Sequence, residues 1–147
     1  MRDYQPVNTA HDLIIIMSQS FGYFDAQTNR DVLTRLASGL RKGGRIILDL
    51  WNPDFFVAHQ GARTFHCREG DVHEIKRVKD GKLFVSLEYL VGAKESFEWQ
   101  LYNLVEMKAL ARSSGLAINS ACVGFDRKRK IDTDDSRIQF VLERLSA

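Results

Sequence analysis

The chain has 147 residues, enough for one domain with its own hydrophobic core. Hydrophobic residues make up 44% and charged residues 27%, which is typical of ordinary globular proteins, and a net charge of +2 implies no polyanionic partner such as nucleic acid. No apolar run reaches transmembrane length, and the N-terminus lacks the apolar core of a signal peptide. We therefore expect no membrane partner and, by default, a cytoplasmic protein.

The cysteines and histidines do not predict a metal site. Cys67 and Cys122 are isolated, which indicates two buried or half-buried thiols in a reducing compartment. His66, Cys67 and His73 lack the spacing of a zinc finger, and no fourth ligand is evident.

The first predicted unit, residues 12–57, is a strand, a helix and a second strand. The apolar run Leu13–Met17 contains three successive isoleucines, which favours a strand buried on both faces over a buried helix. Apolar residues at helical spacing predict a helix that begins near residue 28 or 29 and stops at Gly43-Gly44. The second strand is Arg45–Leu50, and this order predicts two parallel strands in a βαβ unit.

The second predicted unit, residues 58–102, is an inserted antiparallel β-hairpin region. Alternating apolar and polar residues predict three strands near 72–78, 83–91 and 94–102, with a tight hairpin at Asp80-Gly81. One face of these strands is expected to be wet because it must carry five charged residues: Glu74, Lys76, Glu88, Lys94 and Glu98.

The third predicted unit, residues 103–147, is a helix followed by antiparallel strands. Asn103 and Glu106 have nearly the spacing of a capping box, and Gly115 ends the helix. Val105, Leu110 and Ala111 are expected on its buried side. The last strand, "RIQFVLERL", alternates so that one face carries Ile138, Phe140 and Leu142.

The order of these segments resembles a known family. "DLIIIMSQSFGYF", "LRKGGRIILDL" and "LYNLVEMKALARSSGL" look like the later two-thirds of a class I S-adenosylmethionine-dependent methyltransferase. The resemblance implies an α/β fold with a truncated Rossmann-like sheet, because the family's first strand, glycine-rich GxGxG turn, first helix and second strand have no counterpart here. That segment holds the methionine part and the ribose of the cofactor in the family, so S-adenosylmethionine is implied as a cofactor whose binding is in doubt.

The missing neighbour of Leu13–Met17 has a structural consequence. In the family, the matching strand lies beside the absent first strand, so here it becomes an apolar sheet edge. We expect a second copy to cover this edge in a homodimer. The alternative is that the chain is a fragment whose own missing half covers it.

The resemblance also implies site residues. Cofactor contacts are expected at Arg2 and Asp3, which match the segment that flanks the adenine, and at Ser18 and Gln19, which follow the first strand. The substrate pocket is expected to contain Ser20, Phe21, Tyr23, Trp51 and Tyr102. In the alternative interpretation Ser18 and Ser20 bind loop backbone, Phe21 and Tyr23 are core residues, and Asp49 is a turn acceptor.

No catalytic residue is assigned. "SQSF" differs from the Asn/Asp-Pro-Pro-aromatic motif of amino methyltransferases in the family, which favours a small-molecule acceptor over nucleic-acid bases. Three interpretations remain: a small-molecule methyltransferase, inactive or incomplete as this isolated chain; a non-catalytic homodimeric module derived from that fold; and an unrelated α/β protein.

Overall fold

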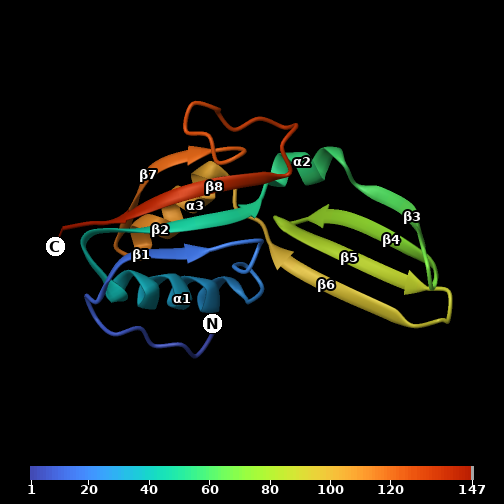
Figure 1. Ribbon diagram of the computed structural model, residues 1–147, viewed down its shortest axis with the longest axis horizontal. Helices are drawn as coiled ribbons and strands as arrows, with labels where there is room; N and C mark the ends of the chain where they lie inside the picture. Colours follow the sequence, from blue (N-terminus) through green and yellow to red (C-terminus); the bar gives the residue numbers. More distant parts are fainter. Residues whose placement is uncertain (147) are drawn as a thin grey trace.

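A computed structural model describes residues 1–146, which form two four-stranded sheets and three helices (Figure 1). Sheet A has the order β1-β2-β8-β7, with β1 (His11–Ile16) parallel to β2 (Leu40–Trp51). The last strand of the chain, β8 (Arg137–Arg144), runs antiparallel to both β2 and β7 (Leu116–Cys122). The predicted βαβ unit is therefore present, since α1 (Ala26–Gly39) connects the two parallel strands.

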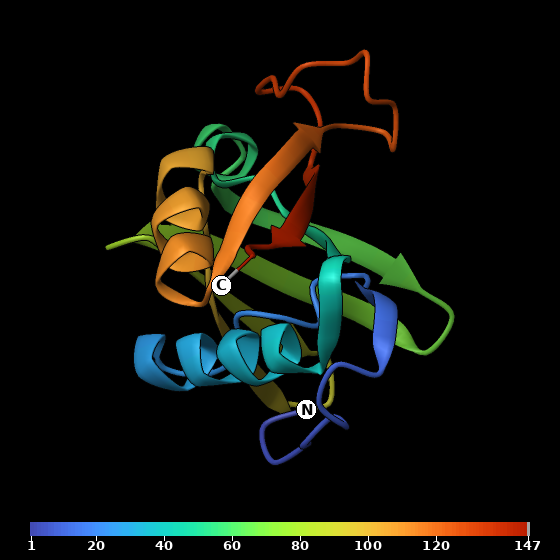
Figure 2. The same cartoon turned by 90° about the vertical axis from the view of Figure 1, so that its left-hand side faces the viewer.

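Sheet B is an antiparallel sheet that extends to one side of sheet A (Figure 1). It follows the short helix α2 (Pro53–Ala58) and consists of β3 (Gly61–Cys67), β4 (Gly70–Lys79), β5 (Lys82–Tyr89) and β6 (Lys94–Gln100). The chain then returns to sheet A through α3 (Leu104–Ser113). Helices α1 and α3 lie side by side on the same face of sheet A (Figure 2).

The boundaries of α1 differ from the prediction at both ends. Asp25 caps the helix by accepting a hydrogen bond from the Thr28 main-chain N–H at 2.9 Å, and the helix ends at Gly39. A side chain at Gly39 would place its Cβ only 2.7 Å from the Pro6 Cβ, so this glycine allows the N-terminal segment to pack closely. The prediction that Gly43 ends the helix was wrong: it lies in a bulge of β2 with a φ of +72°.

The two faces of sheet A have different surroundings. The face towards α1 and α3 carries Ile46, Leu48 and Phe140, each fully buried, and Ile138 and Leu142 lie with them as predicted. On the opposite face of β1, Leu13 is 49% and Ile15 54% exposed. The prediction that this strand is buried on both faces was therefore wrong for the described chain, because no helix of residues 1–146 packs on that side.

The predicted hairpin of sheet B is confirmed. Asp80 and Gly81 have φ angles of +51° and +73°. A two-residue hairpin turn needs positive φ at both residues so that its twist matches that of the flanking strands. Strand β3 was not predicted, because its side chains are exposed and its sequence shows no alternation; main-chain pairing with β4 forms it. Glu74 and Lys76 do not lie on the wet face as expected, since they share a side of β4 with Val78, which packs on the smaller core.

Helix α3 has the predicted capping box between Asn103 and Glu106, and Gly115 follows it with a φ of +77°. Leu110 and Ala111 are buried with Met107, whereas Val105 is exposed, contrary to the prediction. Its position two residues before Met107 places it about 200° around the helix from that residue.

Two further observations complete the fold. Cys122 is buried, but Cys67 is exposed and not half-buried as expected, and neither forms a disulfide. Within residues 1–146, no helix combines the length and the apolarity needed to cross a membrane.

Candidate functional site

The turn after β1 is held to the end of β2 by Asp49. Ser18 and Gln19 have φ angles of +56° and +57°, which non-glycine residues rarely adopt. The Ser18 N–H donates to the Asp49 carboxylate at 3.2 Å, and the Gln19 N–H donates to the Asp49 carbonyl at 3.0 Å. These bonds stabilise a backbone conformation that is otherwise unfavourable.

Asp49 itself is buried, with 2% of its surface exposed. Its carboxylate accepts hydrogen bonds from Arg137 Nη1 at 2.6 Å and from Gln139 Nε2 at 2.8 Å, both on the neighbouring strand β8. With the Ser18 N–H, three donors surround this carboxylate. Asp49 is therefore a structural acceptor, the alternative that its position at a strand end also indicated.

The predicted polar residues of the turn also bind local groups. Gln19 is buried, donates from Nε2 to the Phe21 carbonyl at 2.9 Å, and accepts from the Trp51 main-chain N–H through Oε1. The Ser20 hydroxyl donates to the Met17 carbonyl at 2.7 Å. The geometry places Gln19 as a link between the ends of β1 and β2.

Phe21 and Tyr102 lie inside the larger core, with ring centroids 5.8 Å apart. Asn29, a buried residue of α1, donates from Nδ2 to the Tyr102 hydroxyl at 3.1 Å. Burial raises the pKa of Tyr102 to about 12, so this phenol stays neutral near pH 7. Sequence reasoning treated Asn29 as a possible start of the helix and missed its bond to Tyr102; an asparagine inside an amphipathic helix was the available signal.

Tyr23, Trp51 and Trp99 form an aromatic cluster where β2 and β6 end. The ring centroids of Tyr23 and Trp99 are 5.5 Å apart, and those of Trp51 and Trp99 are 4.7 Å apart. Tyr23 is exposed and Trp51 half-buried, so this cluster offers an apolar surface to a ligand.

The other two predicted cofactor residues lie elsewhere. The Arg2 carbonyl accepts a hydrogen bond from Arg35 in the second half of α1, and both Arg2 and Asp3 are exposed. That half of α1 leads to the start of β2, whereas Ser18 and Gln19 bind Asp49 near the end of β2. The structure therefore does not bring the two pairs together.

The connection between β1 and α1 is not a glycine-rich cradle, since Gly22 is its single glycine. The glycine in this connection, Gly22, has a φ of +103°, but its open side faces the Gln100 carbonyl, 2.6 Å from where a Cβ would lie. The Asp25 side chain binds the Thr28 N–H at the start of α1, which is the donor group that an incoming anion would use. Within residues 1–146, this connection therefore offers neither an open glycine nor a free Thr28 N–H to an anionic group.

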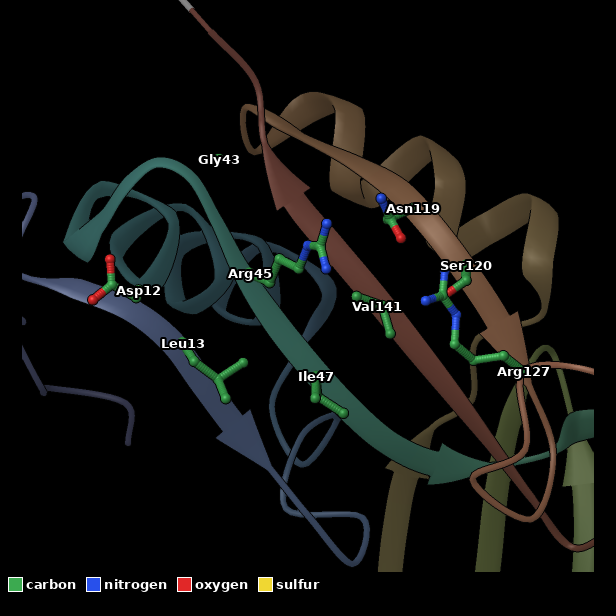
Figure 3. Close-up of a pocket in the computed structure, with 9 residues that line it drawn as sticks. All are labelled: Asp12, Leu13, Gly43, Arg45, Ile47, Asn119, Ser120, Arg127 and Val141. Atoms are coloured by element: carbon green, nitrogen blue, oxygen red, sulfur yellow. The ribbon is translucent and has the colours of Figure 1, made fainter.

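The uncovered face of sheet A carries a shallow hollow of about 500 Å³ (Figure 3). Leu13, Ile47 and Val141 form its apolar floor, and Arg45, Asn119 and Arg127 project from the ribbon around it (Figure 3). In residues 1–146, β1 pairs with β2 alone, so the free edge of the sheet borders this hollow.

Comparisons with known proteins give fold matches alone. No protein-family model and no curated protein matches the sequence. Among solved structures, the chain is similar to an S-adenosylmethionine-dependent methyltransferase from Clostridium acetobutylicum, with a TM-score of 0.77 and 15% identity over 98% of this chain and 62% of the other. CcbJ methyltransferase from Streptomyces caelestis gives a TM-score of 0.78 and 15% identity over 99% and 61%.

A third similar structure is CalS10 with bound S-adenosylmethionine, an amino pentose methyltransferase from Micromonospora echinaspora. It matches with a TM-score of 0.67 and 13% identity over 98% of this chain and 62% of the other. The fold is therefore that of class I S-adenosylmethionine-dependent methyltransferases, as the sequence motifs predicted. The chain spans less than two-thirds of the length of these three structures.

Proposed function

We propose that this chain is the acceptor-binding part of a small-molecule methyltransferase and does not hold S-adenosylmethionine by itself. The fold supports the class, since nearly the whole chain matches methyltransferases that are longer than it is. The second half of the proposal rests on the sequence, since residues 1–147 contain no GxGxG turn that could bring the backbone close to the methionine part of the cofactor.

Calorimetry with S-adenosylmethionine and S-adenosylhomocysteine tests this proposal. We expect no binding heat with either compound at millimolar concentration. Micromolar binding of either one would show that the 147 residues form a complete cofactor site, and the proposal would then be wrong.

A second candidate is a non-catalytic homodimeric module that uses the same fold for assembly. The open edge of β1 favours it, because main-chain groups that have no strand partner within residues 1–146 lie beside the exposed side chains of Leu13, Ile15 and Met17. Antiparallel pairing of two copies about Ile14 would place Leu13 of one copy opposite Ile15 of the other and extend the apolar face across both.

Sedimentation separates the two candidates. A dimer at micromolar concentration would favour the assembly module, and a monomer without dye-binding apolar surface would exclude it. A dimer that also binds a small acceptor would support both roles in one molecule.

A further inference from the structure

A groove of about 400 Å³ lies between α2 and sheet B. We call it the α2–β4 groove. Phe55, Phe56 and His59 form one wall, and Arg63, Glu74 and Lys76 form the other. The Phe56 ring lies 5.2 Å from the ring of Trp51, so the groove adjoins the aromatic cluster described above. Its volume is within the range of small-molecule sites.

The charged wall carries two cations and one anion. Arg63 Nε donates to Glu74 Oε1 at 2.5 Å, and Lys76 Nζ forms an ion pair with the same oxygen at 2.9 Å. Glu74 is 9% exposed. Burial raises its pKa, but the hydrogen bonds and charges of Arg63 and Lys76 outweigh burial and hold the pKa below its ordinary value. Glu74 is therefore ionised near pH 7, and these three side chains sum to a charge of +1.

Arg63 retains donors for a ligand. It binds Glu74 through Nε, and its two terminal amino groups have no hydrogen-bond partner in residues 1–146. More than half of the Arg63 side chain is exposed, and its guanidinium lies over the Phe65 ring, with Cζ 4.2 Å from the centroid. A guanidinium presents parallel N–H groups that match the two oxygens of a carboxylate.

The opposite wall suits a flat apolar body. The rings of Phe55 and His59 are stacked, with centroids 3.9 Å apart and an interplanar angle of 15°. His59 Nδ1 lies 2.7 Å from the Phe55 carbonyl oxygen, which fixes the imidazole in this orientation. Lys76 Nζ lies 5.8 Å from the Phe56 centroid, so the cationic and aromatic walls meet inside the groove.

We propose that the α2–β4 groove binds a planar aromatic monocarboxylate. Its carboxylate would take the free donors of Arg63, and its ring would pack on the Phe55 and Phe56 side. Aromatic monocarboxylates are thus the proposed class of methyl acceptor. That such a ligand accepts a methyl group rests on the proposed function. A protonated amine would meet a groove of net positive charge, so we do not expect cationic ligands to bind.

The test titrates the full chain with benzoate, its neutral analogue benzamide and the cation benzylamine, followed by amide chemical shifts of groove residues. We expect benzoate to bind at least about tenfold more tightly than benzamide, as a charge-assisted bidentate contact predicts, and benzylamine not to bind. Equal affinity for benzoate and benzamide, or no benzoate binding at millimolar concentration, would overturn the proposal. If inorganic phosphate bound as tightly as benzoate, the proposal that the groove recognises an aromatic ring would be wrong.

Three variants locate the contact. Arg63→Gln should weaken benzoate binding at least about tenfold. Because the Arg63 side chain is more than half exposed, we expect this variant to remain folded, which circular dichroism checks. Glu74→Gln should tighten benzoate binding about threefold, because the summed charge of the wall rises. The matched control is Arg77→Gln, an equal change of charge on the opposite side of β4, which should leave the affinity within about twofold.

An equal loss in the Arg63→Gln and Arg77→Gln variants would show non-specific attraction and refute the site. None of these titrations contains S-adenosylmethionine. Failure of the groove proposal is therefore distinguishable from failure of the proposed function, which the cofactor calorimetry tests separately.

Discussion

Replacement of Asp49 by Asn tests whether this carboxylate holds the turn after β1. An asparagine keeps the size but has one acceptor oxygen, so its amide must face at least one of the three donors: Arg137, Gln139 or the Ser18 N–H. Losing a buried, charge-assisted partner costs about 1.5–3 kcal/mol. The Arg137 side chain is 38% exposed and can be hydrated in the variant, which reduces the free-energy cost of losing its bond. An asparagine N–H that faces another donor adds about 1 kcal/mol to the cost. We expect a loss of about 2–3 kcal/mol in the free energy of unfolding.

Urea denaturation followed by far-UV circular dichroism measures this loss. The control is Asp12→Asn, the same substitution in the exposed pair with Arg41 at 3.3 Å, which should change stability by less than about 0.5 kcal/mol. A double-mutant cycle with Arg137→Met should give a coupling energy of about 1–2 kcal/mol. A loss below about 0.5 kcal/mol in Asp49→Asn, or no coupling to Arg137, would refute the assignment of Asp49 as an anchor.

Three further changes test other parts of the structure. Gly22→Ala should destabilise by about 1–3 kcal/mol, because the new Cβ meets the Gln100 carbonyl; unchanged urea stability would contradict this close approach. If two copies pair through β1 as the second candidate proposes, Ile15→Lys should convert this dimer into a monomer in sedimentation, with little loss of monomer stability because the side chain is exposed. A dimer that persists in this variant would refute pairing through β1. Glu74 has a lowered pKa, so its contribution to the free energy of unfolding is present above the ordinary pKa and is lost as the pH falls through the folded-state pKa. Glu74→Gln should therefore destabilise the protein more at about pH 7 than at about pH 3. An equal loss of stability at both pH values would contradict the ion pairs.

Local patterns in the sequence predicted those structural features that residues a few positions apart in the chain determine. The parallel β1–α1–β2 unit, the turn at Asp80-Gly81 and the cap at Asn103 all follow from spacing and turn chemistry within a few residues. The order of the motifs also indicated the methyltransferase fold, because the same succession of strands and helices recurs with similar punctuation in that family. These features need no knowledge of distant contacts.

Contacts between distant segments decided the rest. The bonds that join Asp49 to Arg137, Glu74 to Arg63, and Gln100 to Gly22 cross from one strand or turn to another, and no local pattern encodes them. Strand β3 exists because its backbone pairs with β4, although its side chains stay in water. Side-chain alternation reports which residues share a face, but the packing of whole elements determines whether that face meets solvent, a core or a ligand.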